Sequence, residues 1–305
     1  MIHVEKLSEL KGHSGAVYSL SKGLFSSGVF SASGDKMLAN WDLDNFQFSG
    51  FSVKLPSIVY SVLYREDNQT LWIGTFTGHI HIIDVSTKTE IKCLQLNKGG
   101  IFKIIHVASH NNIFISTAAG CFVVLDDEHY TVKKEFQLSS LKLRNIELEE
   151  KLNRFYITDG IGDFHVFDLN SLTKIATIKA HKDSCNALLI HPKLPYLITG
   201  GKDALLNVID KNSFKIVKSI PAHNYAIYDI VFLNGLNLLA TASRDKTIKL
   251  WDANSFDFLV RISKENYDAH SHSVNSLYWV ENKNMLLSAG DDQKINIWKI
   301  TNSTI

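Results

Sequence analysis

Apolar and polar residues alternate with a period of two along most of the chain, and no segment keeps the 3.6-residue period of an amphipathic helix. Residues 187–220 show the pattern clearly. Two apolar runs flank a Pro-containing turn at 191–195, and two further runs cover Leu205–Ile209 and Phe214–Ile220. The runs are rich in β-branched and aromatic residues, which favour strands. The pattern therefore predicts an all-β fold built from groups of four short strands.

A repeat of 42 residues organises these groups. Six aspartates stand at this spacing, and each follows a large apolar residue: Asp42, Asp84, Asp126, Asp168, Asp210 and Asp252. A seventh unit ends at Trp298, after an insertion of five residues within 263–268. Because charged residues of all types make up only 21% of the chain, five successive matches are not expected by chance. The chain is therefore an array of seven similar units.

Four of the units share a set of side chains in one register. A histidine precedes an aspartate by 22 residues, a hydroxyl lies four residues before that aspartate, and a large apolar residue lies six residues after it. The sets are His13, Ser31, Asp35 and Trp41; His181, Thr199, Asp203 and Ile209; His223, Thr241, Asp245 and Trp251; and His270, Ser288, Asp292 and Trp298. With its Gly-His or Ala-His dipeptides, this pattern resembles the WD-repeat (WD40) family of β-propellers. The resemblance implies a seven-bladed β-propeller with four antiparallel strands per blade, forming one domain over residues 1–305.

The two ends of the chain fit one shared blade. Subtracting 42 from the fourth strand at Phe46–Val53 places another fourth strand at Val4–Lys11, whereas the last unit ends with its third strand at Lys294–Ile300. In the family that the chain resembles, the first strand completes the last blade, which removes the open sheet edges. We expect the N-terminal strand to close the ring in this way.

Three consecutive units lack the polar set. They carry Leu55, Asn97 and Ser139 in place of the histidine, and Thr77, Ala119 and Ile161 in place of the turn aspartate. We expect these units to rely on apolar packing and on turn glycines.

The Asp-His-Ser/Thr combinations have the composition of a nucleophilic triad, which would indicate a hydrolase. A catalytic triad is needed once, however, and here the combination occurs four times. The family resemblance implies a structural network in which the histidine bridges the aspartate and the hydroxyl, and the hydroxyl contacts the Trp indole. We therefore predict no catalytic residues, no cofactor and no enzymatic activity.

Composition and charge narrow the remaining possibilities. The chain is 45% hydrophobic and its net charge is +1, which excludes a disordered chain and gives no overall basic field for nucleic acid or an anionic membrane. Three cysteines at unrelated spacings do not form a disulfide framework, and no apolar stretch is long enough to span a membrane. The start of the chain lacks the apolar block of a signal peptide. We expect a soluble cytoplasmic protein.

Two pairs of histidines, His79 with His81 and His270 with His272, have the spacing of partial metal sites. A zinc site would need further ligands, and the sequence does not indicate them. Solvent-facing histidines are the preferred interpretation, so no metal site is predicted.

The family resemblance implies that partners dock on one face of the ring, here called the top face. It carries the connections between the outer strand of one blade and the inner strand of the next, and those between the second and third strands. Three positions per blade project there, and we predict partner contacts from these residues: Tyr18, Tyr60, Phe76, Phe102, Lys142, Arg144, Asn186, Lys202, Tyr228, Arg244 and Asn275. Aromatic residues gather in the first three units and cations in the next three, with Asp291 the only carboxylate at these positions. The alternative is that the rings pack inward and the charges are merely solvated.

We favour the function of a non-enzymatic scaffold. Its partner would be a protein or peptide that carries acidic and apolar residues. The scaffold is expected to be monomeric by itself, with no membrane contact. Two alternatives remain open at this stage. One is a small-molecule binder or enzyme that uses the central channel, and the other is an RNA-binding assembly factor, against which the near-neutral charge argues. The insertion at 263–268 falls on the same face, either as a partner contact or as a tolerated lengthening of a loop.

Overall fold

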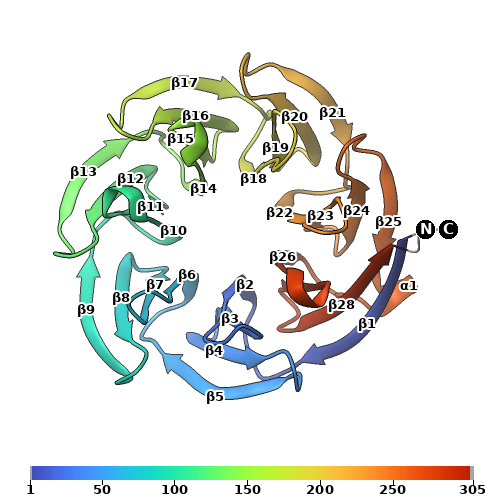
Figure 1. Cartoon of the computed structure of the whole chain (residues 1–305), viewed down its shortest axis with the longest axis horizontal. Coiled ribbons are helices and arrows are strands. Elements are labelled where there is room, and N and C mark those ends of the chain that lie inside the picture. Colours follow the sequence, from blue (N-terminus) through green and yellow to red (C-terminus); the bar gives the residue numbers. More distant parts are fainter. Residues whose placement is uncertain (1, 303–305) are drawn as a thin grey trace.

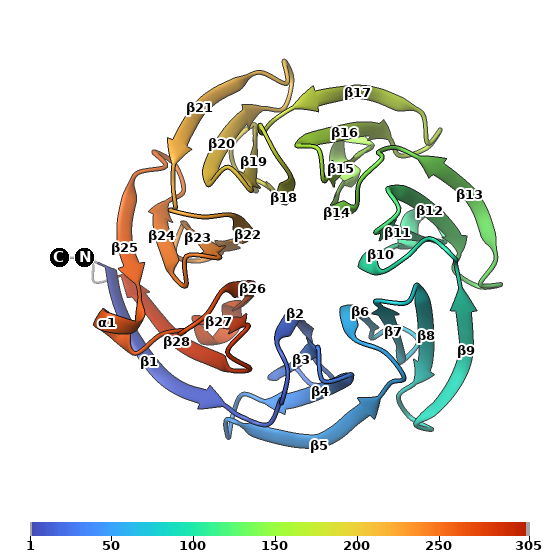
Figure 2. The ribbon, with the colours of Figure 1, turned by 180° about the vertical axis from the view of Figure 1, so that it is seen from behind.

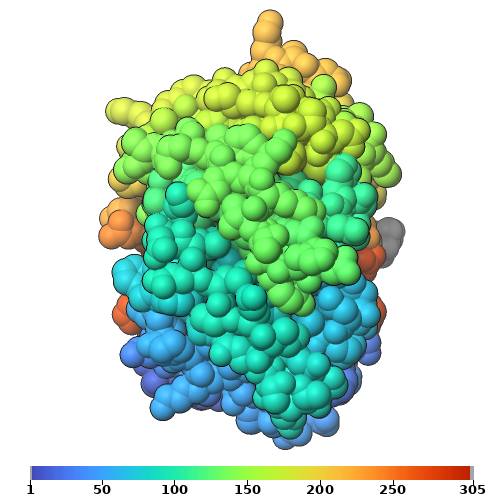
Figure 3. Space-filling view, turned by 90° about the vertical axis from the view of Figure 1, so that its left-hand side faces the viewer, coloured from blue at the N-terminus to red at the C-terminus, as the bar shows by residue number. Residues whose placement is uncertain are grey.

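The computed structural model describes residues 2–302, and these residues form 28 strands in seven four-stranded sheets around a central axis (Figure 1). Paired strands in the sheets are antiparallel, as in the sheet of β2 to β5. The first strand of each unit lies next to the axis and the fourth forms the rim. Seen from its edge, the ring is a thick disc (Figure 3). The predicted all-β, seven-bladed propeller is confirmed.

The first three blades follow one another along the chain. Blade 1 comprises β2 (Val17–Lys22), β3 (Gly28–Ser33), β4 (Met37–Asp42) and β5 (Gln47–Lys54). Blade 2 comprises β6 (Val59–Arg65), β7 (Thr70–Thr75), β8 (His79–Asp84) and β9 (Thr89–Gln95). Blade 3 comprises β10 (Ile101–Val107), the 3-10 helix η1 (Ala108–His110), β11 (Asn112–Thr117), β12 (Cys121–Asp126) and β13 (Val132–Gln137).

The remaining blades repeat this order, and the last includes the first strand of the chain. Blade 4 comprises β14 (Leu143–Glu149), η2 (Glu150–Leu152), β15 (Arg154–Asp159), β16 (Asp163–Asp168) and β17 (Lys174–Lys179). Blade 5 comprises β18 (Cys185–Ile190), β19 (Tyr196–Gly201), β20 (Leu205–Asp210) and β21 (Ile216–Pro221). Blade 6 comprises β22 (Ile227–Leu233), β23 (Leu238–Ser243), β24 (Ile248–Asp252) and β25 (Phe258–Ile262). Blade 7 comprises β26 (Val274–Val280), η3 (Glu281–Lys283), β27 (Met285–Gly290), β28 (Ile295–Asn302) and β1 (Ile2–Leu10), and the helix α1 (Lys264–Tyr267) precedes it.

The hydrophobic core is divided into clusters that lie between neighbouring blades. The described residues form seven such clusters, and each draws its side chains from two adjacent blades. In the cluster between blades 7 and 1, for example, Leu10 and Leu287 pack with Val17 and Trp41. In blade 1, β3 and β4 are largely buried, whereas β5 is mostly exposed with Phe51 as its one buried residue, which is the pattern of a strand at the rim. Burial of apolar surface therefore holds each blade to both of its neighbours.

The ring is closed by β1, which pairs with β28 in an antiparallel register that joins Ile2 to Asn302 and Leu10 to Ile295. The predicted closing strand is thus confirmed, with bounds that differ by two residues at its start and one at its end. Val4 from β1 packs in the same cluster as Trp298 and Ile300. Closure pairs the outer edge of β28 and covers the interface between blades 6 and 7.

The five-residue insertion lies against the closing strand. It forms α1, between β25 and β26, at the edge of the top face that Figure 2 shows. The Lys6 ammonium of β1 donates to the Asp268 backbone oxygen (2.7 Å) and lies 3.1 Å from the Asp268 carboxylate. Tyr267 packs against the cluster that contains Val4. The insertion therefore has a contact within the protein, which the sequence did not indicate.

A carboxylate in the closing strand makes closure sensitive to acid. Burial alone would raise the pKa of Glu9, but hydrogen bonds from Lys294, Lys6 and Lys11 lower it to about 2. Its ordinary value in an unfolded chain is about 4.3. The folded state therefore gains stability from this group above about pH 4.3 and loses it as the pH falls towards 2.

We predict that Glu9→Gln lowers the free energy of unfolding at pH 7, and that the difference from the parent shrinks as the pH falls from about 5 to about 2. Urea denaturation over this pH range measures the difference. The control is Glu128→Gln, which removes an exposed carboxylate that forms no ion pair in the described part of the chain. A difference that stays constant with pH would show that the charge of Glu9 does not stabilise the closing strand.

Candidate functional site

The top face is built by the inner strands and the connections that lead to them. Because neighbouring strands are antiparallel, the outer-to-inner connections and those between the second and third strands emerge at the same end of every blade. Each inner strand has a register shift at its second residue, as between Val17 and Ser19 or between Ile227 and Asp229. Such a bulge turns the extra side chain away from the regular pleat. The residues at this position are Tyr18, Tyr60, Phe102, Arg144, Asn186, Tyr228 and Asn275.

Aromatic side chains of blades 1 to 3 form a continuous strip at this position. The ring centroids of Tyr18 and Tyr60 are 5.2 Å apart in an edge-to-face arrangement, and Tyr60 stacks on Phe102 at 5.2 Å with an interplanar angle of 10°. Phe76 meets Tyr60 edge-on at 5.8 Å, and 53% of Phe76 is exposed. We call Tyr18, Tyr60, Phe76 and Phe102 the aromatic strip. Aromatic pairs of this geometry contribute about 0.5–1.5 kcal/mol each beyond their buried area, so the strip is a preformed surface.

Arg144 extends the strip into blade 4. Its guanidinium carbon lies 5.1 Å from the centroid of Phe102, within the range of a cation–π contact. Burial lowers the pKa of Arg144, while the neighbouring phenols of Tyr228 and Tyr60 act in the opposite direction. The Nε atom of Arg144 is buried and has no hydrogen-bond partner within residues 2–302. Arg144 is thus a half-buried cation with unused hydrogen-bonding capacity rather than a fully solvated one.

The other predicted cations lie in the connections of blades 4 to 6. Burial, and then the charges of Arg144 and Lys202, lower the pKa of Lys142, which shows that these three cations are neighbours. Arg244 lies over the ring of Tyr225, 5.9 Å from its centroid. Over residues 2–302, none of Lys142, Arg144, Lys202 and Arg244 forms an ion pair with a carboxylate. This side of the top face therefore holds positive charge without internal compensation.

Two residues that were predicted to contact a partner, Asn186 and Asn275, form hydrogen bonds to the neighbouring blade. Asn186 is only 7% exposed, and its amide donates to the backbone oxygen of Ile227 (3.0 Å) in the next blade. Asn275 donates to the backbone oxygen of Val17 (3.1 Å), which joins blade 7 to blade 1, and to Asp291 (2.8 Å). Asn186, which was predicted to contact a partner, is therefore buried between blades. Tyr228 is half-buried beside Arg144.

The sequence analysis missed several exposed apolar residues in the connections that form the top face. Tyr225 is 60% exposed, Leu141 49% and Ile161 38%. Tyr225 and Leu141 lie in outer-to-inner connections, and Ile161 lies in the turn between β15 and β16. Counting fixed positions from the histidine excluded them, although a search for large apolar residues in these connections would have found them. They enlarge the apolar part of the top face.

Three charged residues of the inner strands, Lys103, Glu147 and Asp229, were also missed. Burial raises the pKa of Glu147 and of Asp229 above their ordinary values. The positive charge of Lys103 opposes this shift but does not cancel it. Asp229 accepts hydrogen bonds from the backbone of Leu277 (2.8 Å) and Ile230 (2.8 Å). Part of its hydrogen-bonding capacity is therefore already used by the ring.

All four Asp-His-hydroxyl sets are hydrogen-bonded. In blade 1, His13 Nδ1 lies 2.8 Å from the Asp35 carboxylate, and its Nε2 lies 2.7 Å from Ser31 Oγ, which also accepts from the indole of Trp41 (2.7 Å). The same contacts recur with distances of 2.7–3.0 Å in the sets of His181, His223 and His270, although the first of these lacks the Trp. Burial alone would raise the pKa of Asp35, but the hydrogen bond from His13 lowers it.

The burial of the hydroxyl groups bears on the choice between a structural and a catalytic role. Ser31, Thr199, Thr241 and Ser288 are each 0% exposed. A nucleophile has to reach its substrate, and these oxygens are closed off by the protein. Their hydrogen bonds instead connect the histidine of the loop that enters a blade with the second strand, and the bond from that histidine to the aspartate reaches the turn between the second and third strands.

The three units without this set have other polar contacts. In blade 4, the buried Asp159 accepts from the backbone of Ile161 (3.1 Å) and Asp163 (2.9 Å), and lies 3.2 Å from His165 Nε2. In blade 3, the Thr117 hydroxyl bonds the backbone of Cys121 in both directions. A Cβ on Gly120, at φ +75°, would lie 2.1 Å from the Ser139 oxygen. The expectation of packing and glycines alone was therefore incomplete.

The histidine pairs are not simply solvent-facing. His270 is 0% exposed and belongs to a polar set, and His81 is only 7% exposed. The solvent-facing interpretation is wrong for these two residues, because their strand and loop positions turn the rings towards the protein.

Seven sheets, closed by the first strand, define the protein as a seven-bladed β-propeller. The sequence profile of the WD40 family (WD domain, G-beta repeat) matches residues 4–42, 172–210, 214–252 and 262–299, together just over half of the chain. The chain belongs to the WD40 family. The matched segments contain the four polar sets, and the unmatched blades are those that lack them. Propellers of this family are commonly protein-interaction scaffolds and are generally not enzymes. No helix of residues 2–302 has the length and apolar character needed to cross a bilayer.

We predict that His223→Ala lowers the free energy of unfolding by about 1–3 kcal/mol, because it strands the buried Asp245 and Thr241. Chemical denaturation measures the loss. The matched control is His272→Ala, which removes an exposed histidine outside the sets and should change stability by less than about 0.5 kcal/mol. Unchanged stability together with loss of a hydrolytic activity would overturn the structural role.

Proposed function

We propose that this protein is a non-enzymatic scaffold whose top face binds a protein segment. The bound segment would be an extended peptide with an apolar or aromatic anchor and flanking acidic residues. The observation that carries the proposal is the continuity of the aromatic strip with a group of cations that has no carboxylate partner in the described residues. One ligand with both kinds of side chain would satisfy both surfaces.

The aromatic strip supplies the place for the anchor. Phe76 is more than half exposed and stands edge-on to Tyr60, whose other neighbours are Tyr18 and Phe102. Tyr, Phe and Arg are enriched at protein interfaces, and a few such residues carry most of the binding energy. The rings already contact one another, so these side chains lose little conformational entropy when a partner binds.

The cations favour an acidic partner. Lys142 lies near Arg144 and Lys202, and their repulsion contributes to the lowered pKa of Lys142. Carboxylates from a ligand would relieve this repulsion between the cations. Exposed charges of this kind mainly raise the association rate and set specificity, because salt screens them.

Other parts of the proposal rest on the sequence alone. The chain is proposed to be one domain, monomeric by itself and cytoplasmic. A small-molecule binder or enzyme that uses the central channel is the alternative, since Lys103, Glu147 and Asp229 belong to the inner strands next to the axis. RNA is the weaker alternative, and a steep linear dependence of log affinity on log salt would identify it.

A peptide library selected on the immobilised protein tests the proposal directly. We expect enriched sequences with an aromatic or aliphatic anchor next to Asp or Glu. For a selected peptide, Tyr60→Ala with Phe102→Ala should weaken binding by about 30-fold or more at every salt concentration, which corresponds to about 2 kcal/mol. Calorimetry or fluorescence anisotropy measures the affinity. The control is Leu152→Ala, which truncates a residue that is 45% exposed on the opposite face. Equal affinities for the double variant and the parent would remove the top face from the proposal.

The cationic side has its own prediction. Lys202→Gln with Arg244→Gln should slow association of the same peptide at low salt, and the difference from the parent should decrease as salt is added. Stopped-flow or surface-based kinetics measure the rates. Lys151→Gln with Lys193→Gln makes the same change in net charge at exposed positions on the opposite face. If this control slows association equally, overall charge rather than the local cations steers the peptide.

A further inference from the structure

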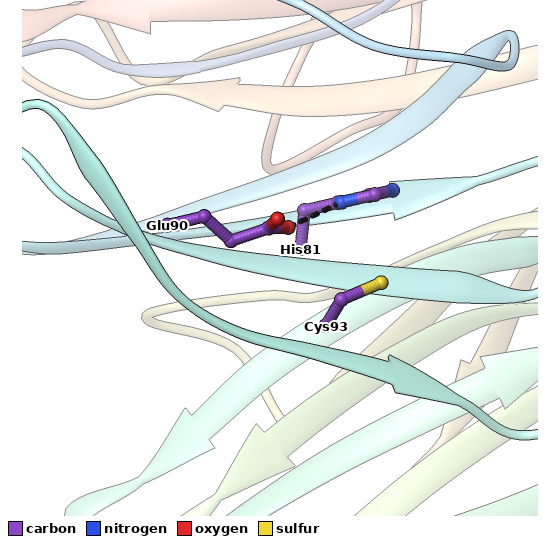
Figure 4. A group of neighbouring side chains, drawn as sticks. All are labelled: His81, Glu90 and Cys93. Carbon is purple, nitrogen blue, oxygen red and sulfur yellow. Dashed lines mark hydrogen bonds and ion pairs between the residues drawn. The ribbon is translucent and has the colours of Figure 1, made fainter.

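Three side chains with metal-binding atoms meet on the outer half of blade 2 (Figure 4). His81 lies on β8, and Glu90 and Cys93 lie on the neighbouring β9. His81 and Cys93 are opposite each other in the strand register, so their side chains share one face of the sheet. One donor atom from each of the three residues lies within 4.8 Å of the other two. The group is formed by residues 81–93 alone, across a single strand pair.

The imidazole of His81 is the buried member of the group. It is 7% exposed, and its Nδ1 lies 2.6 Å from the Glu90 carboxylate. Its other ring nitrogen, Nε2, is buried and has no hydrogen-bond partner in the described residues. Buried polar atoms in folded proteins are nearly always paired, so this ring lacks one of its two usual partners. The ring is therefore held in place but incompletely satisfied.

The donor set has the chemistry of a zinc site. Imidazole nitrogen, thiolate sulfur and carboxylate oxygen are the ligands of Zn²⁺, which binds them at about 2.0–2.3 Å in a tetrahedral arrangement. That arrangement separates the donor atoms from one another by about 3.4–3.6 Å. The 2.6 Å distance between His81 Nδ1 and the Glu90 carboxylate would have to lengthen. The longer distances between donor atoms, which reach up to 4.8 Å, would have to shorten. The side chain of Glu90 is 46% exposed and Cys93 is exposed, so both can rotate without disturbing the core.

We propose that His81, Glu90 and Cys93 bind a divalent zinc-type ion, with water as the fourth ligand. The ion would bind His81 at Nδ1 in place of the hydrogen bond to Glu90, with the ring proton on Nε2, and the Cys93 thiol would release its proton to water. It would cross-link β8 to β9 in a blade whose unit has Leu55 and Thr77 in place of the family histidine and aspartate. The site lies on the side of the propeller, apart from the aromatic strip, so it is independent of the proposed top-face function.

The accessibility of the thiols provides a specific readout. Cys93 is exposed, whereas Cys121 and Cys185 are buried. In the native protein, the rate of alkylation by iodoacetamide therefore reports on Cys93. We expect one equivalent of Zn²⁺ to slow this alkylation at least tenfold, and a chelator to restore the rate. We also expect Co²⁺ to produce the absorption band of a thiolate-bound metal.

Variants separate this site from other metal binding. Glu90→Gln and Cys93→Ser change exposed side chains and should leave the fold intact while lowering the affinity for Zn²⁺ at least tenfold, measured by competition with a chromophoric chelator. His79→Ala is the matched control, since it removes a neighbouring imidazole outside the group and should bind Zn²⁺ like the parent. The proposal is overturned if Zn²⁺ leaves the alkylation rate unchanged, or if the parent and Cys93→Ser bind Zn²⁺ equally well.

Discussion

The pairing of β1 with β28 is the contact on which the rest of the ring depends. Each blade is held by apolar clusters that it shares with two neighbours, so a ring of seven blades needs all seven interfaces. The closing strand supplies Val4 to the cluster between blades 6 and 7, and Leu10 to the cluster between blades 7 and 1. It is also held by Lys6 to Asp268 and by Glu9 to Lys294. Backbone pairing, apolar burial and charge therefore act at the same seam.

A closed ring fixes the spacing of the seven bulged residues around the channel. The polar sets add local rigidity, because each ties the loop entering a blade to the turn between its second and third strands. Tyr18 lies in blade 1, which has a polar set, whereas Tyr60, Phe76 and Phe102 lie in blades without one and are held by their contacts with one another. The ring can thus present a preformed surface, and under the proposed function the side chains at the bulges determine what it binds.

Much of the fold could be predicted from the sequence, because a 42-residue period and alternating strands specify seven units of four strands, and the family resemblance implied closure by the first strand. The register also placed Tyr60, Phe102 and Arg144 at equivalent positions. It could not tell that Asn186 is buried or that Arg144 lies against Phe102, since both depend on side-chain direction at a bulge. The His165 contact with Asp159 and the group around His81 depend on pairing between strands. A single chain read in order does not reveal such contacts.

Hydrogen–deuterium exchange with and without a selected acidic, aromatic peptide tests the central claim most directly. The account predicts slower exchange in the outer-to-inner connections of blades 1 to 4, at residues 55–58, 96–100 and 138–142. It predicts no change in η1 and η2, at residues 108–110 and 150–152 on the opposite face. Slower exchange confined to η1, η2 or the rim strands would contradict the assignment of the top face as the binding surface.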